Sequence, residues 1–512
     1  MTADRGGTTI EVTLGSHSRE RAQPSCPKCT AGQRSHAIAT VAIIRGTESE
    51  RATEKRDRLP RMDNLLIPPT EEGLAIAAQL IRSGGLVAFP TETVYGLGAN
   101  ALDAAAVQSI FTAKGRPLTD PLIVHVATPE DALDLIELNE TEAEVYRLLI
   151  AAFWPGPLTL IAKASARVPS LVTAGTGFVG VRCPRHALAK RLLVAAQVPI
   201  AAPSANRFGH VSPTTAAHVL TDLGAKGVHV LDGEAQTQAS DASSDSSSGS
   251  GNCEFGIESS VVKIDAQGMQ LIIFRQGGVT EPQLLACLRR GLQQGELSQA
   301  WKVVAVQRAV KMHSTEGPAT STQHTQHTAP SGPTASATAA AVEEASMAGA
   351  QQAPGQAITH YAPDVPCVSV RSMLPRTAEG AGGSLADAGA VAGAVTVTGA
   401  ELGAGCVLVD FGAQLAPWQS RCLAYRDLSQ QGSAAEAARR LFDTLRWAET
   451  VPHATRVFIA AIPSTPAISP VSESARQSAG AGGGELEADL TLGLADRIFR
   501  AASGVTVDII VV

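Results

Sequence analysis

The chain has 512 residues, of which 44% are hydrophobic and 17% are charged, and its formal net charge at pH 7 is −7. This length allows two or three domains with sizeable cores. The negative charge argues against a uniformly basic nucleic-acid-binding protein, although a local basic groove stays open. No hydrophobic run approaches the roughly 20 residues that a membrane-spanning helix needs. The eight cysteines form no regular framework, which is typical of a reducing compartment.

Residues 1–64 are rich in arginine and also contain several acidic residues, without the hydrophobic segment of a secretory signal. We therefore expect a disordered extension, and targeting to an organelle stays an open alternative. Cys26 and Cys29 form a Cys-x-x-Cys motif in this extension. A zinc site would need two more ligands at a comparable spacing, and none is nearby. We predict two incidental thiols and no metal site.

Residues 65–300 are predicted to form an α/β domain, because helical and strand patterns alternate along the segment. The first helix, at 71–83, places Leu74, Ala77, Ala78 and Ile81 on one stripe. Another helix is predicted to begin at Thr128, and further helices are predicted at 141–153, 185–197, 214–223 and 281–292. Strands are predicted at 86–89, 122–127, 158–163, 179–182, 200–202, 228–231, 260–264 and 271–275.

Two of these helices have N-terminal capping motifs. Thr128 and Asp131 are predicted to cap one helix, and Thr280 and Gln283 are predicted to form a capping box at the other.

The segment 86–125 carries the first candidate site. A hydrophobic run leads into a polar turn that contains Thr93 and two glycines, and a short helix then brings Lys114 and Arg116 to a Gly-Arg-Pro turn. Two cations beside a glycine-containing turn suit a polyphosphate or a carboxylate. They equally suit a simple interaction with the carbonyl end of the helix. A histidine, His125, lies on the strand that follows.

Low-complexity segments divide the rest of the chain. Residues 236–252 are mostly Ser, Asp, Gly and Ala, and we expect a disordered insert within the first domain. Residues 301–363 are expected to form a linker, followed by a smaller doubly wound α/β domain at 364–512 with disordered inserts near 377–403 and 464–486. Its strands are predicted at 407–411, 456–462 and 506–512. Its helices are predicted at 433–448, with Ser433 and Glu436 as a capping box, and at 489–502.

Seven short motifs occur in order along the chain. They read PTETVYGLG at 90–98, WPGPLT at 154–159, VRCP at 181–184, PIAAPSAN at 199–206, FGIESS at 255–260, FRQG at 274–277 and HYAP at 360–363. Together they resemble the YrdC-type threonylcarbamoyl-AMP synthases in their long, two-domain form. The resemblance implies a twisted mixed sheet with a large open cavity. It also implies an enzyme, a nucleotidyltransferase, that joins L-threonine, bicarbonate and ATP into threonylcarbamoyl-AMP and pyrophosphate.

The same resemblance implies roles for individual residues. Lys114 and Arg116 are expected to offset the triphosphate charge as catalytic residues, and Tyr361 to belong to a lid. The residues expected to bind threonine are Thr93, His125, Arg182, Ala202 and Ser259. Those expected to face ATP are Arg116, Asp120, Ser204, Asn206, Ser212 and Arg275. Mg²⁺ is expected with ATP, bound mostly through phosphate oxygens and water, and no protein ligand is assigned to it.

Each of these residues has a simpler interpretation when taken alone. His125 would be a hydrogen-bonded core histidine, Arg182 would form a surface ion pair, and Ser204 and Asn206 would bond their own turn. Three departures from the family pattern stand out. Phe178 replaces a threonine, Glu234 replaces a glycine, and the segment 355–359, with Ile358, lacks the usual tyrosine and lysines.

Two other functions stay open. One is a carbamoyltransferase of hydrogenase maturation, which contains a related domain but adds paired Cys-x-x-Cys motifs and an upstream module. The other is a non-catalytic RNA-binding module, since folds of this type have a basic concave face. For the synthase, the resemblance implies delivery of the product to a complex that modifies tRNA beside the anticodon. We expect a cytoplasmic protein without membrane contact.

Overall fold

The computed structural model describes residues 65–234, 253–306, 351, 353–354, 360–375, 394–462 and 483–512, with the backbone alone at 394 and 483–489. The expected N-terminal extension with Cys26 and Cys29, the insert at 236–252 and most of the linker therefore lie outside the described residues. So do segment 355–359 and most of the inserts expected near 377–403 and 464–486.

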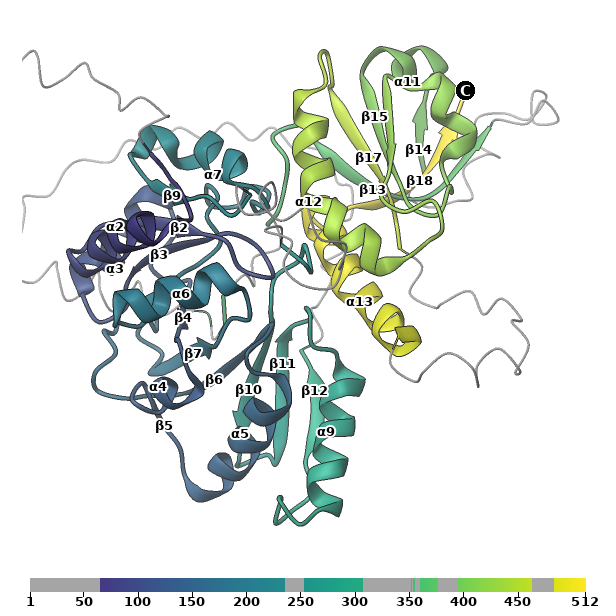
Figure 1. The fold of residues 1–512 in the computed structure, drawn as a ribbon. Helices are drawn as coiled ribbons and strands as arrows, with labels where there is room; N and C mark the ends of the chain where they lie inside the picture. Colours follow the sequence, from purple (N-terminus) through teal and green to yellow (C-terminus); the bar gives the residue numbers. More distant parts are fainter. Residues whose placement is uncertain are drawn as a thin grey trace, which may run out of the picture. The chain divides into compact units, whose positions relative to one another are not determined.

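The first domain is built on a mixed sheet of 12 strands (Figure 1). Its strands are β1 (Leu66–Ile67), β2 (Val87–Phe89), β3 (Gly96–Asn100), β4 (Ile123–His125), β5 (Ile136–Glu137), β6 (Leu158–Ala164), β7 (Phe178–Arg182), β8 (Ile200–Ala201), β9 (His229–Leu231), β10 (Ser260–Asp265), β11 (Gln270–Arg275) and β12 (Lys302–Ala305). Their order across the sheet is β1-β9-β2-β3-β8-β4-β7-β6-β10-β11-β12, and β5 pairs with β6. The twisted mixed sheet predicted from the sequence is confirmed.

Helices pack on this sheet through hydrophobic stripes. They are α2 (Glu71–Arg82), α3 (Ala104–Lys114), α4 (Pro129–Leu133), α5 (Glu140–Phe153), α6 (Ala187–Ala196), α7 (Ala216–Leu223) with the 3-10 turn η2 (Gly224–Lys226), and α9 (Glu281–Gln293). The predicted stripe of α2 is buried, and both capping motifs, at Thr128 and at Thr280, form as reciprocal capping boxes. Helices thus begin where side chains satisfy the free N–H groups of the first turn.

The strand register brings His125 and Arg182 together. β4 runs parallel to β7, and His125, the last residue of β4, lies opposite Arg182, the last residue of β7. β8 pairs with β4 on its other side, and the backbone N–H of Ala202 donates to the carbonyl of Ile123. Three residues that are distant in the sequence therefore meet where three strands end.

The polar turn predicted around residues 91–98 is only partly a turn, because Gly96 begins strand β3. At Gly98 a Cβ atom would lie 2.9 Å from both the Ile200 and the Phe89 side chains. Glycine is present here because neighbouring chains approach closely, and this close approach lets β3 pair with both β2 and β8.

Both ends of the gap at 235–252 are bound near the start of α7. The Glu234 carboxylate accepts a hydrogen bond of 2.7 Å from the N–H of Ala216, the first residue of α7. The Cys253 thiol donates to the carbonyl of Thr214 over 3.7 Å. An acidic side chain suits the N-terminal end of a helix, so Glu234 in place of glycine is accommodated.

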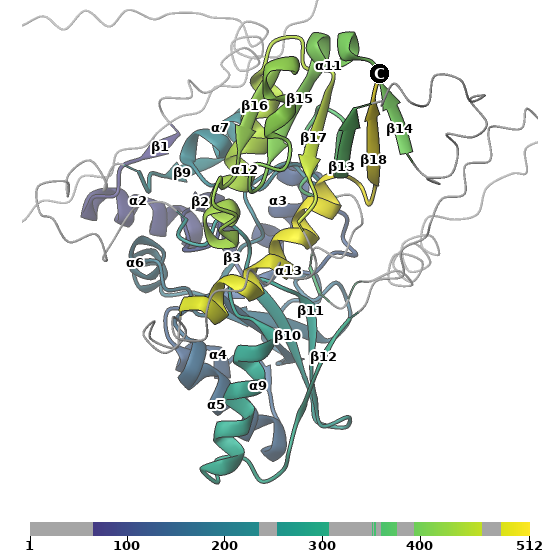
Figure 2. The ribbon, with the colours of Figure 1, turned by 90° about the vertical axis from the view of Figure 1, so that its right-hand side faces the viewer.

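The second domain has a sheet of six parallel strands in the order β14-β18-β13-β17-β15-β16 (Figure 2). Its elements are β13 (Cys367–Pro375), β14 (Ala394–Val397), α11 (Gly399–Gly405), β15 (Cys406–Asp410), η4 (Ala416–Arg421), β16 (Ala424–Asp427), α12 (Ala434–Thr450), β17 (Arg456–Ala460), α13 (Gly483–Ala501) and β18 (Thr506–Val511). The expected second α/β domain is confirmed. None of the helices in the described part of the chain is long and hydrophobic enough to cross a membrane.

The capping box predicted for α12 forms only in part. The Ser433 side chain accepts from the N–H of Glu436, as expected. The Glu436 carboxylate does not return to the backbone N–H of Ser433. It accepts the Ser429 hydroxyl at 2.6 Å and pairs with Arg440 at 3.1 Å. Two stronger donors thus compete for the carboxylate, and the reciprocal half of the prediction is wrong.

Candidate functional site

A cavity opens where β4, β7 and β8 end. Its wall contains most of the residues predicted for threonine and ATP, and also Pro354 and His360 from the linker. The predicted residues on the wall are Thr93, Arg116, His125, Arg182, Ala202, Ser204, Ser259, Arg275 and Tyr361. Lys114, Asp120, Asn206 and Ser212 are not among the lining residues that the structure describes, and lie behind the wall.

Arg182 and Glu92 form a buried ion pair at this wall. Nη2 of Arg182 lies 2.7 Å from Oε1 of Glu92, and Nη1 donates to the Thr93 hydroxyl at 3.0 Å. Burial by itself would raise the pKa of the Glu92 carboxyl, but the Arg182 guanidinium outweighs burial and holds that pKa below its usual value. Arg182 also lines the cavity, and a guanidinium fixed at its wall suits a ligand carboxylate.

His125 is a neutral imidazole in this setting. Its side chain is buried against Phe89, with ring centroids 6.1 Å apart. Burial, followed by repulsion from Arg182, lowers the pKa of His125 to about 3. Nδ1 finds no hydrogen-bond partner among the described residues. A neutral ring can accept or donate a hydrogen bond according to its tautomer, so it can bind a hydroxyl or an amine.

Ser259 links the two halves of the cavity wall. Its hydroxyl is 2.8 Å from the Thr159 hydroxyl and accepts from Nη2 of Arg275 at 3.1 Å. Arg275 also donates from Nε to the Ser259 carbonyl. The predicted threonine residue Ser259 and the predicted nucleotide residue Arg275 therefore support each other directly.

Lys114 supports the turn at 203–206 from behind. Its ammonium group donates to the carbonyls of Ser204, at 2.6 Å, and of Asn206, at 2.5 Å. Burial, and then repulsion by Arg116, holds the pKa of Lys114 well below its usual value. The structure thus gives Lys114 a positioning role in the turn, and a direct phosphate contact stays a prediction.

Arg116 lines the cavity and is fixed by its own loop. It pairs with Asp120 at 2.9 Å and donates to the carbonyls of Asp120 and Pro121. Asp120 therefore orients the guanidinium from behind the wall, and its expected contact with ATP stays a prediction. The arginine presents a fixed positive charge to whatever fills the cavity.

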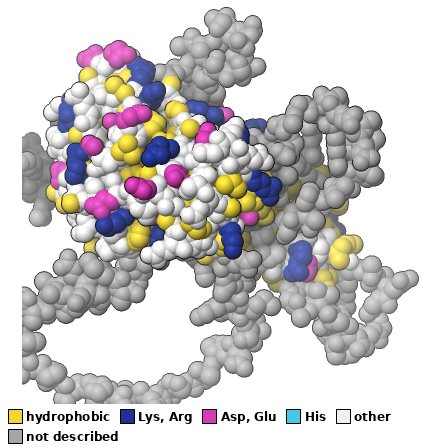
Figure 3. Space-filling model, turned by 90° about the horizontal axis from the view of Figure 1, so that it is seen from below, with side chains coloured by type: hydrophobic (Ala, Val, Ile, Leu, Met, Phe, Trp, Pro, Cys, Tyr) yellow, Lys and Arg dark blue, Asp and Glu magenta, His cyan; other side chains and the backbone are white. Residues whose placement is uncertain are grey.

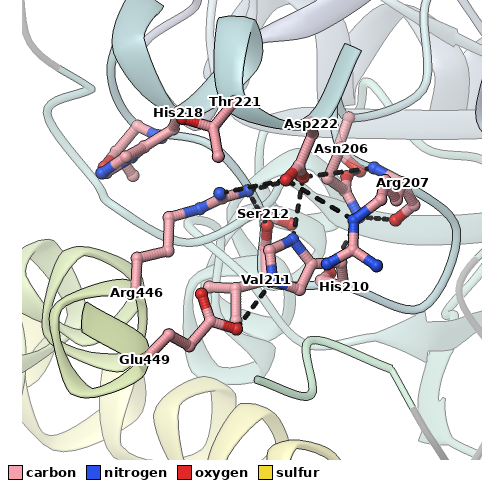
Figure 4. A network of polar contacts seen from close by, with 12 residues as sticks. Asn206, Arg207, His210, Val211, Ser212, His218, Thr221, Asp222, Arg446 and Glu449 are labelled. Atoms are coloured by element: carbon pink, nitrogen blue, oxygen red, sulfur yellow. Dashed lines mark hydrogen bonds and ion pairs between the residues drawn. The ribbon is translucent and has the colours of Figure 1, made fainter. Parts of the chain in front are cut away.

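Asn206 and Ser204 bond each other within the turn, as the simpler interpretation predicts. The Ser204 hydroxyl donates to Oδ1 of Asn206. Nδ2 of Asn206 donates to the carbonyls of Arg207 and His210 (Figure 4). Ser204 nevertheless lines the cavity. The turn is thus pre-formed, so binding a phosphate there would not require the loop to be ordered first.

Ser212 contacts the cavity wall through Glu258, a carboxylate that the sequence did not predict as a site residue. Its hydroxyl donates to Oε1 of Glu258 at 2.6 Å, and Glu258 lines the cavity. Burial would raise the pKa of Glu258, but Arg497 and Arg275 outweigh burial and hold it below its usual value. Glu92 was missed as well. Only its position in PTETVYGLG, one residue before Thr93, could have drawn attention to it.

The HYAP motif closes one side of the cavity. His360 stacks on Tyr361 with centroids 4.2 Å apart and planes 7° apart. Nδ1 of His360 and the Tyr361 hydroxyl are buried without a hydrogen-bond partner in the described part of the chain. Ala362 is bound through its N–H to the carbonyl of Gly209 at 3.0 Å. The linker therefore lies against the cavity and presents two unpaired polar atoms.

Phe178 does not take the place of a ligand-binding threonine, because it is not among the described lining residues. It packs beside a small core cluster that includes Ala353, and the Lys263 ammonium lies 3.8 Å from its ring centroid. Phe178 thus helps to hold the linker residue that precedes Pro354.

Two family models match the chain. One, described as "Telomere recombination", matches residues 79–244, and the other, described as "Threonylcarbamoyl-AMP synthase, C-terminal domain", matches residues 303–503. A threonylcarbamoyl-AMP synthase of Vibrio vulnificus is 34% identical over 154 residues, which are 30% of this chain and 82% of that protein. The chain belongs to the threonylcarbamoyl-AMP synthase family.

Longer members of the family are also similar to this chain. The synthase of Pyrococcus abyssi is 45% identical over 206 residues, or 40% of this chain, and this match spans about half (54%) of that relative's length. The crystal structure of P. abyssi Sua5 complexed with L-threonine has a TM-score of 0.56 and 27% identity, covering 87% of this chain and 99% of that one. The similarity in structure thus extends over both domains.

Proposed function

We propose that this chain forms threonylcarbamoyl-AMP and pyrophosphate from L-threonine, bicarbonate and ATP. The observation that carries the proposal is a set of buried, unpaired polar atoms on residues that line one cavity. They are Nδ1 of His125, Nδ1 of His360 and the hydroxyl of Tyr361, and each lacks a partner among the described residues. Buried polar atoms are rarely left without partners, so these three indicate a polar ligand.

The threonine side of the proposed site is formed by Arg182, Thr93 and His125. The guanidinium would bind the amino-acid carboxylate, and the neutral imidazole would bind its hydroxyl or amine. The threonine amine and bicarbonate give a carbamate with loss of water. The P. abyssi protein has been crystallised with L-threonine, which supports this assignment by similarity.

The nucleotide side is formed by Arg116, Arg275 and the turn at Ser204. A carbamate oxygen attacks the α-phosphorus of ATP, the bond to the β-phosphate oxygen breaks, and pyrophosphate leaves with the electron pair. The carbamate and ATP are both anions, so fixed guanidinium charges at the cavity wall should supply most of the transition-state stabilisation. No protein nucleophile is required by this scheme.

Mg²⁺ is proposed to enter with ATP. The three carboxylates at the described site, Glu92, Glu258 and Asp120, are each engaged by an arginine. They therefore fit poorly as direct ligands, whereas phosphate oxygens and water suit this ion. The ion would neutralise phosphate charge, and the arginines would orient the same phosphates.

The proposed product is a mixed anhydride that is easily hydrolysed, so we propose that it passes to a complex that transfers the carbamoyl unit to tRNA. The described cysteines are free thiols, in keeping with a reducing, cytoplasmic location. An RNA-binding role without catalysis remains the second candidate. On the face shown in Figure 3, basic and acidic side chains are interspersed, which favours no extended RNA contact on that face.

Pyrophosphate release by the purified protein tests the proposal. Release should require ATP, L-threonine and bicarbonate together, and labelled bicarbonate should appear in an adenylate. L-Valine, which has the shape of threonine without its hydroxyl, should support much slower release. RNA binding without threonine-dependent pyrophosphate release would contradict the proposed reaction.

A further inference from the structure

Two buried arginines of the second domain bind polar groups of the first. Arg446 lies on α12 and Arg497 on α13, and their side chains are 6% and 0% exposed. Both domains belong to one unit that spans Leu59–Val512. Burying a guanidinium is unfavourable unless it is paired and hydrogen-bonded. A hydrophobic contact would join the two domains at a lower desolvation cost than a buried guanidinium does. The groups that these two arginines bind therefore indicate what the arginines do.

Arg446 holds the segment between Asn206 and Ser212. Its two terminal nitrogens lie 3.4 and 2.9 Å from the two oxygens of Asp222, and it also donates to the carbonyl of Val211 (Figure 4). Asp222 in turn accepts from the N–H of Arg207 at 3.2 Å and lies 2.8 Å from the ring of His210. One ion pair between the domains therefore fixes the backbone next to Ser212.

Glu449, which also lies on α12, contacts the same segment through His210. Nε2 of His210 lies 2.8 Å from Glu449, while Nδ1 faces Asp222. Burial would lower the pKa of His210, but the two carboxylates outweigh burial and raise it. The 207–211 backbone is thus held from α12 by Arg446 and by Glu449.

Arg497 reaches the cavity wall itself. Its Nε lies 3.1 Å from Oε2 of Glu258, its Nη1 donates to the carbonyl of Gln276, and its guanidinium carbon is 5.7 Å from the ring centroid of Tyr361. The other oxygen of Glu258 accepts the Ser212 hydroxyl. The two arginines therefore act on the same pair, Ser212 and Glu258, from two helices.

We propose that Arg446 and Arg497 are positioning residues, through which the second domain holds the Ser212–Glu258 wall of the cavity in place. This inference rests on the proposed function. Neither arginine is a lining residue in the described structure. They act through Asp222 and Glu258, and their loss should displace groups that face the nucleotide while leaving the Arg182 side unchanged.

The test compares Arg446→Met and Arg497→Met with Arg440→Met in the full chain. Arg440 lies on α12 with a side chain 46% exposed, and its partners in the described structure, Glu436 and the carbonyl of Leu428, both belong to the second domain. A displacement of about 1 Å costs on the order of 100-fold in rate. We expect kcat for pyrophosphate release to fall about that much in each buried variant, with Kd for L-threonine within about threefold of the parent. Arg440→Met should be unchanged.

Two further measurements separate positioning from loss of fold. Arg497→Lys keeps the charge and should restore part of kcat. Amide exchange of residues 207–212 should accelerate in Arg446→Met at temperatures where the rest of the chain exchanges as in the parent. The inference would be overturned if Arg446→Met and Arg497→Met kept the amide exchange and the kcat of the parent. It would also be overturned if the fall in rate of each variant equalled the fraction of its molecules that are unfolded. An inactive parent would refute the proposed function instead, and amide exchange would then still decide whether Arg446 orders the segment.

Discussion

Replacing Arg182 separates its structural role from its proposed role in binding. Arg182→Met removes the partner of Glu92, whose side chain is only 2% exposed, and also the bond to Thr93. A buried carboxylate left without its partner typically lowers the free energy of unfolding by about 3–5 kcal/mol. Adding Glu92→Gln removes the uncompensated charge, so the double variant should regain most of that stability.

The affinity for L-threonine should not change in parallel with stability in the single and double variants. A hydrogen bond to a charged group contributes about 1.5–3 kcal/mol. Both the single and the double variant should therefore bind L-threonine roughly 10- to 150-fold more weakly than the parent. Urea unfolding measures the stability, and titration calorimetry of L-threonine measures the affinity.

The control is Arg185→Met, three residues further along. Arg185 pairs with Glu254 at the surface, with side chains 47% and 60% exposed, and such pairs contribute at most about 1 kcal/mol. If the double variant binds L-threonine as tightly as the parent, Arg182 serves only to neutralise Glu92 and our assignment of the threonine carboxylate is wrong.

Three other outcomes are expected. Arg116→Ala should reduce kcat for pyrophosphate release about 100-fold, a loss of about 3 kcal/mol, with threonine binding retained in calorimetry; near-parental turnover would contradict the nucleotide assignment. Gly98→Ala should lower stability to urea by about 1–3 kcal/mol because its Cβ would meet two side chains at 2.9 Å, whereas Gly403→Ala, on the helix α11, should be neutral or slightly stabilising. His125 takes up a proton near its ordinary pKa of 6.5 in the unfolded chain but only near 3 in the folded one, so His125 should lower the free energy of unfolding by about 2 kcal/mol between pH 7 and pH 5. The variant His125→Asn should lose this part of the pH dependence of stability. If its stability depends on pH as that of the parent does, the imidazole is not held neutral.

The regular elements of the first domain could be predicted because their signals are local. The stripe of α2 and the capping boxes at Thr128 and Thr280 depend on residues three or four apart. Strands β1 and β5, of two residues each, exist only through pairing with distant partners. Strand β3 was hidden because its glycines read as a turn, and only the neighbouring Phe89 and Ile200 explain them.

The site was predictable residue by residue, but its pairings were not. Family motifs pointed to Arg182 and His125, and the strand register that joins them lies beyond any local pattern. The partner of Arg182, Glu92, carries no signal of its own, because a carboxylate in a loop is usually solvated. Lys114 was read as facing a ligand, yet its bonds to the carbonyls of Ser204 and Asn206 need the tertiary fold to be seen.

The two bonds that flank the gap at 235–252 have a consequence for engineering. Glu234 is bound to Ala216 and Cys253 to Thr214, so these two residues are both held within a few residues of one helix start. For ends already held together, doubling the length of a connecting chain costs only about 0.6 kcal/mol in closure entropy. This point of the domain is therefore a suitable place to graft a fluorescent reporter or an affinity tag, with the strand pairings on either side left as they are.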